Sequence, residues 1–273
     1  MTEEENVAYK KYYKEVIEPC WENELNKKLK KEYEKLDLSV LDDEIKEKLS
    51  CPLLIFPGLN YNVGEGIFII GKDPKEWGHN DIGSDFLSFE NPPVGIDKEK
   101  TLMEAQADWF LWNYEEECGK GNTFFNAVKK ITGINQGKNF FESPFVWDDL
   151  IAVSYNGGSY MNPEVSEIDK KRIVEYSEKK LRMELSIAKP KIAIFLIGTY
   201  AGYGGCFWNM FPEIREKDLK HVEGFSDLNH FVLTLEGHSI ECYATSHPCS
   251  KKWNDGKNEV LKKLAEIVSE APK

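Results

Sequence analysis

The chain has 273 residues, of which 41% are hydrophobic and 12% aromatic. This composition is typical of a globular protein with a sizeable core and excludes a disordered chain. The formal net charge of −12 argues against broad, non-specific binding to a polyanion, although a local basic rim would still permit contact with nucleic acid. No apolar stretch approaches the roughly 20 residues that span a bilayer. The polar N-terminus does not resemble a secretory signal, so the expected localisation is cytoplasmic.

The spacing of apolar residues changes along the chain. Residues 7–49 have apolar positions at helical spacing and predict helices, so we expect residues 1–50 to form a helical extension packed on a single domain, residues 51–273. Within that domain, apolar runs predict strands at 66–71, 149–156 and 191–198, and helical patterns occupy 101–118, 123–133, 166–188 and 258–271. Residues 230–248 predict two strands joined at Glu236-Gly237. Strands that alternate with helices predict an α/β fold with a mainly parallel sheet.

Polar side chains stand at the ends of the predicted strands. Asp73 follows the first strand, Asn156 ends the second, and His247 follows the last. Sites in open parallel sheets form beyond the carboxyl ends of the strands, so these three residues are candidates for one site. Each also has a structural interpretation, because Asp-Pro, Asn-Gly and His-Pro are common in turns.

Other familiar site motifs are absent from the sequence. The six cysteines form no C-x-x-C pair, and His238, Cys242, His247 and Cys249 match no metal-ligand template. We therefore expect no metal and no cofactor. The sequence has no G-x-S-x-G elbow, Walker loop or G-x-G-x-x-G fingerprint, so an unrelated hydrolase or nucleotide enzyme has no support. The glycine-rich run at 202–205 is expected to be a turn.

The order of these motifs resembles the uracil-DNA glycosylase superfamily. That order is "GKDP", a strand ending in asparagine, "IFLIG" and "SHPCS", over roughly residues 66–255. The family's first motif is Gly-Gln-Asp-Pro-Tyr-His and its last is His-Pro-Ser-Pro-Leu-Ser. "SCPLLIFPGLNY" together with "GKDPKEWG" is similar to a divergent prokaryotic branch of the superfamily. The resemblance implies a three-layer α/β/α domain with a mainly parallel central sheet, with the helical layer at the N-terminus added to it.

The resemblance also implies roles for individual residues. Asp73 matches the aspartate that orients water and stabilises the cationic sugar, and His247 matches the histidine that donates a hydrogen bond to the departing base. Asn156 matches the amide that reads the edge of the base. Phe86 or Phe89 is expected to stack on the flipped base, with Phe86 preferred, although core packing explains either phenylalanine equally well.

Several positions depart from the family pattern. Lys72 replaces the glutamine before the aspartate, and Lys75 replaces the tyrosine that excludes a 5-methyl group. Lys251 stands where the wedge leucine is found, and Trp253 would either wedge into DNA or pack on the last helix. Lys72, Lys75, Lys251 and Lys252 flank the outer motifs and are candidates for contacting phosphates, although loop lysines are usually just solvated.

These features support two main functional hypotheses. The first is a DNA glycosylase that hydrolyses the N-glycosidic bond of uracil or another modified base flipped from single- or double-stranded DNA, in repair or in defence against foreign DNA such as that of phage. The second is a catalytically silent nucleic-acid or nucleotide-binding module on the same fold, which the lysine replacements favour. A monomer is expected.

Overall fold

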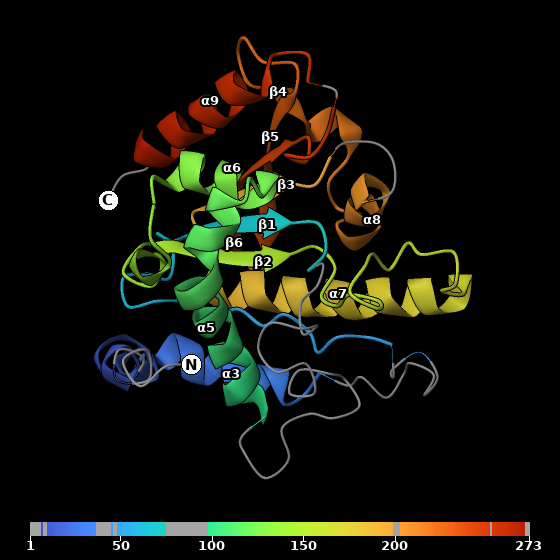
Figure 1. Ribbon diagram of the computed structural model, residues 1–273. Coiled ribbons are helices and arrows are strands. Elements are labelled where there is room, and N and C mark those ends of the chain that lie inside the picture. The colour runs from blue at the N-terminus through green and yellow to red at the C-terminus, as the bar shows by residue number, and fades with distance from the viewer. Residues whose placement is uncertain are drawn as a thin grey trace.

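The computed structural model describes residues 7, 10–36, 45, 48–74, 98–198, 203–251 and 253–270. Within these ranges the chain forms an α/β fold around one six-stranded sheet (Figure 1). The strands are β1 (Ile67–Gly71), β2 (Phe145–Asp149), β3 (Ile192–Leu196), β4 (Lys220–His221), β5 (Leu228–Leu235) and β6 (His238–Thr245). The helices are η1 (Tyr13–Ile17), α2 (Glu18–Cys20), α3 (Glu24–Tyr33), α5 (Lys98–Gly119), α6 (Thr123–Thr132), η3 (Gly137–Phe140), α7 (Glu167–Ala188), α8 (Tyr203–Met210), η4 (Glu216–Asp218) and α9 (Lys257–Glu270).

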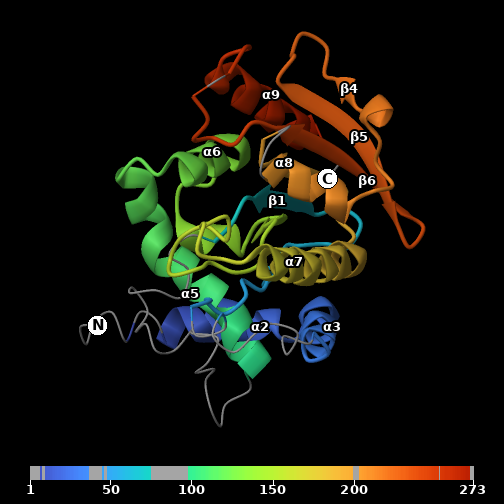
Figure 2. The same cartoon turned by 90° about the vertical axis from the view of Figure 1, so that its right-hand side faces the viewer.

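The sheet is mixed but mainly parallel, as the sequence predicts. Its strand order is β2-β1-β3-β6-β5-β4. The first four of these strands are parallel, and β5 and β4 extend the sheet as antiparallel strands. The carboxyl ends of the four parallel strands therefore meet at one edge. The arrowheads of β1 and β2 point to the right in Figure 1, and Figure 2 looks onto that edge.

Helices cover both faces of the sheet. Helices α5, α6 and α9 lie on one side and α7 and α8 on the other (Figure 2), with α6 packed against α9. Every residue of β1, β2 and β3 is buried, which is the pattern expected of parallel strands covered on both faces. None of the helices in the described ranges combines the length and apolar character needed to cross a bilayer.

Local sequence signals explain where several elements begin and end. The side chain of Asn122 accepts hydrogen bonds from the first turn of α6, and Gly133 closes this helix in the left-handed conformation with φ 73°. Ser166 caps α7 by accepting a hydrogen bond from the backbone N–H of Asp169. Glu236 and Gly237 both have positive φ, 49° and 79°, as a two-residue hairpin turn requires. The predictions of these two helices and of this hairpin are confirmed.

The prediction of a strand at 149–156 is wrong. The strand that pairs with β1 is β2, Phe145–Asp149, and the chain bends after it. Residues 152–154 are buried because they run beside residues 50–53, where the N–H of Leu53 donates to the carbonyl of Ala152 at 2.8 Å and that of Ser50 to Ser154 at 3.0 Å. A run of apolar residues indicates that a segment is buried. It does not distinguish a strand of the sheet from another buried extended segment.

The prediction of a turn at 202–205 is also wrong for the part that the structure describes. Residues 203–205 form the first turn of α8. Its later residues Cys206, Phe207 and Met210 are buried, and the ring of Phe207 contacts Phe195 of β3 and Phe231 of β5. Glycine costs about 1 kcal/mol relative to alanine in a helix, which packing of this kind offsets.

The N-terminal helices are attached through polar contacts as well as apolar ones. The hydroxyl of Tyr13 and the indole N–H of Trp21 both donate to Oε1 of Glu104 on α5, at 2.8 and 2.6 Å. The side-chain amide of Asn26, which is fully buried, donates to the carbonyls of Cys20 and Pro57, both at 2.9 Å. The described N-terminal helices therefore pack against α5 and the segment around Pro57.

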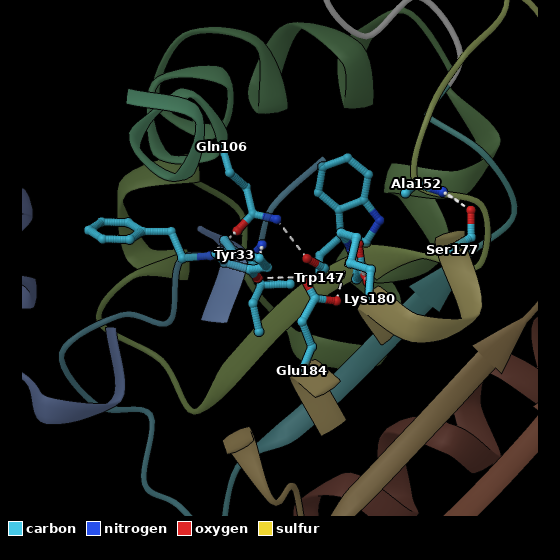
Figure 3. Close-up of polar contacts among 10 residues, drawn as sticks. Tyr33, Gln106, Trp147, Ala152, Ser177, Lys180 and Glu184 are labelled. Atoms are coloured by element: carbon cyan, nitrogen blue, oxygen red, sulfur yellow. Dashed lines mark hydrogen bonds and ion pairs between the residues drawn. The ribbon is translucent and has the colours of Figure 1, made fainter. Parts of the chain in front are cut away.

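A buried polar cluster joins three elements of the fold. We call Tyr33, Asp148, Lys180 and Glu184 the Lys180 cluster; Figure 3 labels Tyr33, Lys180 and Glu184. Nζ of Lys180 donates to both carboxylate oxygens of Asp148 at 2.8 Å and to Glu184 at 2.9 Å. The hydroxyl of Tyr33 donates to the other oxygen of Glu184 and accepts from the N–H of Ile55 at 3.1 Å. The cluster therefore ties α3, β2 and α7 together.

The protonation of this cluster follows from its burial. Burial and the charge of Asp148 raise the pKa of Glu184 well above its usual range, while Lys180 opposes the shift. Burial alone would lower the pKa of Lys180, but the attraction of Asp148 and Glu184 outweighs it and raises that pKa. Lys180 is therefore a cation held between two carboxyl groups, and it compensates the buried charge of Asp148.

Removing the cation should therefore destabilise the fold. We expect Lys180→Ala to lower the free energy of unfolding by about 3–5 kcal/mol, because Asp148 would remain buried without a partner. Chemical denaturation of both proteins would measure this. The matched control is Lys179→Ala, since Lys179 is the exposed neighbour on the same helix and should change stability by less than about 0.5 kcal/mol. Equal effects of the two variants would contradict the account.

Candidate functional site

Strand β1 carries Asp73 to the carboxyl edge of the sheet. The strand ends at Gly71, and Lys72, Asp73 and Pro74 follow it, with Asp73 half-buried. The backbone is fixed on the β2 side, because the carbonyls of Gly71 and Lys72 accept hydrogen bonds from the N–H groups of Leu150 and Ile151 at 3.0 and 2.9 Å. The structure therefore places Asp73 directly beyond β1, as predicted.

Strand β2 ends at the same edge with a second acid, Asp149. It is the register partner of Gly71 and is only 4% exposed. A Cβ atom on Gly71 would overlap Oδ1 of Asp149 and would lie 3.0 Å from the ring of Phe124, so the absence of a side chain at Gly71 lets both groups approach the strand. Asp149 therefore lies against the end of β1, in a position that the sequence assigned to no function.

The environment of Asp149 favours its neutral form. Burial is the largest cause that raises its pKa well above the usual value, followed by the charges of Asp148 and Asp73, while Lys180 opposes the shift. The indole N–H of Trp147 opposes the shift least, and within the described residues this N–H forms no hydrogen bond. Asp149 is therefore a carboxylic acid close to a second carboxyl group, that of Asp73.

The loop after β6 brings His247 to the same place. Its ring is stacked on Phe124 of α6, with centroids 6.0 Å apart and an angle of 9° between the planes. The backbone N–H of Cys249 donates to Nδ1 of His247 at 3.1 Å. A nitrogen that accepts a hydrogen bond carries no proton, so the proton of the neutral ring is on Nε2, which is a donor.

Tyr160 and Cys206 on one side, and Thr123 and Cys249 on the other, also lie at this edge of the sheet. Burial is the largest cause that raises the pKa of Tyr160, and contacts with Cys206 and the charge of Asp73 add to it, which places Asp73 close to Tyr160 as well. The hydroxyl of Tyr160 lies 2.5 Å from Sγ of Cys206 on α8. On the other side, Sγ of Cys249 lies 2.5 Å from the hydroxyl of Thr123, the first residue of α6. The candidate site is thus assembled from β1, β2, α6, α8 and two loops.

The structure places Asn156 differently from the prediction. It lies seven residues beyond the end of β2, on an exposed turn with φ 46°. Its backbone N–H donates to the carbonyl of Lys48 at 2.7 Å. Among the described residues no hydrogen bond or ring contact joins its side chain to Asp73 or His247. Asn156 therefore does not end a sheet strand, and the strand end that it was expected to occupy belongs to Asp149.

The remaining predicted site residues are only partly described. Phe86, Phe89, Lys75 and Lys252 lie outside the described residues. Lys72 is half-buried beside Asp73, and Lys251 is exposed on the loop that follows His247. Trp253 is half-buried and packs against the hydrophobic core, which is the structural alternative considered for it. The role of these residues in contacting DNA remains a prediction.

The four possible metal ligands of the C-terminal region do not gather. His238 begins β6, and its Nε2–H donates to the carbonyl oxygen of Pro190 at 3.0 Å. His247 follows the other end of the strand, which lies about 23 Å from His238 at roughly 3.3 Å per residue. Cys242 lies buried between them. Within the part of the chain that the structure describes, no group of three or more potential ligands is placed to hold a metal ion.

Three residues of the site were missed by sequence reasoning. Asp149 was assigned to the beginning of a strand instead of its end, and Phe124 and Tyr160 were not considered as site residues. One signal for Asp149 was present, because "FVWDD" places two carboxyl groups after three bulky apolar residues. Adjacent strand residues point to opposite faces, so a pair of acids at a strand end requires two different partners. Phe124 has no comparable signal, since its contact with His247 spans more than one hundred residues.

The neutral form of Asp149 makes a specific prediction about stability. A raised pKa in the folded state contributes stability that is present below the unfolded value, near 3.8, and is lost as the pH rises toward the folded value. Asp149→Asn removes this titration. We expect the variant to gain stability relative to the wild-type chain by about 1.4 kcal/mol for each pH unit above 4, until the folded pKa is reached.

Urea denaturation of both proteins from pH 4 to pH 8 would measure this gain. The matched control is Glu65→Gln, because Glu65 is exposed and precedes β1 at the opposite edge of the sheet. The control should follow the wild-type curve. Parallel curves for Asp149→Asn and the wild-type chain would contradict the neutral form.

Comparison with known proteins adds no family assignment. No protein-family model matches the chain, and no curated protein matches it. The account of the site therefore depends on the residues themselves and on the sheet that brings them together.

Proposed function

We propose that this protein is a DNA glycosylase-like hydrolase that cleaves the N-glycosidic bond of a base flipped out of DNA. The observation that carries the proposal is the gathering of Asp73 and His247 at one edge of the sheet, with Phe124 between His247 and the end of β1. A carboxylate, a fixed N–H donor and an aromatic wall are the groups that such a reaction requires.

Each of these groups has a chemical task in the proposed reaction. The bond between the sugar C1′ and the base nitrogen breaks, and its electron pair leaves with the base. The sugar then has cationic character, which the carboxylate of Asp73 stabilises while it orients a water molecule. The oxygen of that water bonds to C1′, and its proton passes to Asp73 or to solvent. Nε2–H of His247 donates to the oxygen of the base on which negative charge develops.

The orientation of His247 supports its task. Because the N–H of Cys249 holds Nδ1 as an acceptor, the donor nitrogen is Nε2 in the neutral ring. A neutral donor is sufficient to stabilise a developing oxyanion. The aromatic ring of Phe124, which is buried beside Gly71, would offer an apolar surface to the base after it has left the stack. The proposal gives Phe124 a role in contacting the base, while the expected stacking of Phe86 or Phe89 stays a prediction.

Lysines around the site would contact the DNA backbone. Lys72 follows β1 and Lys251 follows the His247 loop, so both lie next to the proposed catalytic groups. The net charge of −12 means that this basic rim acts within an acidic protein. Binding to DNA should therefore be weak without the target base and should fall steeply with salt concentration.

A binding module without catalysis is the second candidate. Lys72 replaces the glutamine of the motif that the chain resembles, and Lys75 replaces its tyrosine. These replacements change the residues next to Asp73 in sequence. The fold and the candidate site at the edge of the sheet are kept. This candidate predicts binding that depends on the base, without release of the base.

Base release would test the proposal directly. Purified protein should release base from oligonucleotides that contain uracil, hypoxanthine or a 5-substituted pyrimidine, as detected by mass spectrometry and by strand cleavage in alkali at the abasic site. We expect Asp73→Asn to reduce the rate about 100-fold or more, because the variant loses the negative charge opposite the cationic sugar. The matched control is Glu65→Gln, an exposed carboxylate at the opposite edge, which should have the wild-type rate.

The outcomes separate the two candidates. Release that depends on Asp73 supports the glycosylase. Binding that distinguishes one base from another, with no release from any oligonucleotide of the panel, would replace it with the binding module. Equal affinity for every oligonucleotide without release would exclude both.

A further inference from the structure

Asp149 stands at a strand end of the candidate site, and the proposed reaction gives it no task. Catalysis as described uses Asp73 and His247, and Phe124 forms a wall. Asp149 nevertheless lies among them, paired in register with Gly71 and next to the ring of Phe124. It is 4% exposed, and a buried acid of this kind is usually paired with a cation or a hydrogen-bond donor.

Lys180, the nearby cation, lies on the face of β2 opposite to Asp149 and contacts Asp148. Asp148 and Asp149 are neighbours on β2, so their side chains point to opposite faces of the sheet. Asp148 contacts Lys180 on the α7 side, and Asp149 lies on the side of Phe124 and α6. Within the described residues, the hydrogen bonds of Lys180 go to Asp148 and Glu184. Asp149 therefore has no ion-pair partner among the described residues.

The charged and titratable groups around Asp149 are mostly acidic. Asp73 at the end of β1 and Asp148 on β2 both disfavour its ionised form, and Lys180 on α7 favours it. His247, from the loop after β6, lies on Phe124 and carries its proton on Nε2 in the neutral ring. With burial added, the balance keeps the carboxyl group protonated.

A protonated carboxyl group offers one donor and one acceptor side by side. Uracil, thymine and hypoxanthine present the complementary pair, an N–H next to a C=O, on the edge that pairs in the duplex. Two hydrogen bonds can then form between the acid and the base. An ionised carboxylate has only acceptors, so one of its oxygens would repel the carbonyl of the base.

We propose that Asp149 reads the pairing edge of the flipped base as a neutral carboxylic acid, and that the substrates are bases with a lactam edge, N–H beside C=O. This inference rests on the proposed function. It gives Asp149 the task that sequence reasoning gave to Asn156, and it follows from the place of Asp149 at the end of β2, buried against Gly71 and Phe124.

The pH dependence of base release tests the inference. We would measure kcat/KM on an oligonucleotide with uracil for the wild-type chain, Asp149→Asn and Asp149→Ala. In the wild-type chain, release should fall about tenfold per pH unit above the pH at which Asp149 ionises. Asp149→Asn, whose amide offers a donor and an acceptor at every pH, should lack this alkaline decrease. Asp149→Ala should lower kcat/KM more than tenfold below the pH at which Asp149 ionises, because both hydrogen bonds are lost, and the difference from the wild-type chain should shrink above that pH.

The controls separate the possible outcomes. Ionisation of the base itself affects all three proteins alike, so only the difference between them reports on Asp149. Thermal unfolding of each variant shows whether it is folded at each pH. Release with the same alkaline decrease in Asp149→Asn and in the wild-type chain would overturn this inference and leave the proposed function in place. No release by any of the proteins would overturn the proposed function and the inference with it.

Discussion

The buried cation of Lys180 is the interaction on which the rest of the structure depends. It lies between Asp148 of β2 and Glu184 of α7, and Tyr33 of α3 extends the contact to the N-terminal layer. A charge enclosed in this way is stable only when its partners are held in place. The contacts of Lys180 with Asp148 and Glu184 therefore hold β2 against α7. The hydrogen bond from Tyr33 to Glu184 holds α3 against α7. Gln106 adds a second link, because its side chain joins the N–H of Phe56 to the carbonyl of Trp147 on β2.

Fixing β2 also fixes the candidate site. Asp148 must face Lys180, and the alternation of side chains along a strand then turns Asp149 to the opposite face. Parallel pairing aligns the end of β2 with the end of β1, so that Asp149 lies beside Gly71 and close to Asp73. The loop after β6 ends at the same edge and adds His247. The contact between Lys180 and Asp148 thus decides which of the two acids of β2 faces the candidate site.

The sequence predicts much of the fold and part of the site. The apolar runs of β1 and β3 and the turn at Glu236-Gly237 carry local signals, so these elements and the α/β class follow from them. Asp73 and His247 follow strands that the sequence predicts, so their place at this edge of the sheet could be expected from local signals. The run at 149–156 misled the prediction, because its burial comes from residues 50–53, which are distant in sequence. Phe124 and Asp149 enter the site through contacts between elements, which no local pattern reveals.

The most direct test of the account is a crystal structure of the protein with a DNA duplex that contains pseudouridine, whose carbon–carbon bond between base and sugar resists hydrolysis. The account predicts that this nucleotide leaves the helix and lies against Phe124. Its pairing edge should be within hydrogen-bond distance of Asp149, a base oxygen should be near Nε2 of His247, and C1′ should be beside Asp73. A pseudouridine that stays stacked in the duplex, or one that binds away from these four residues, would contradict it.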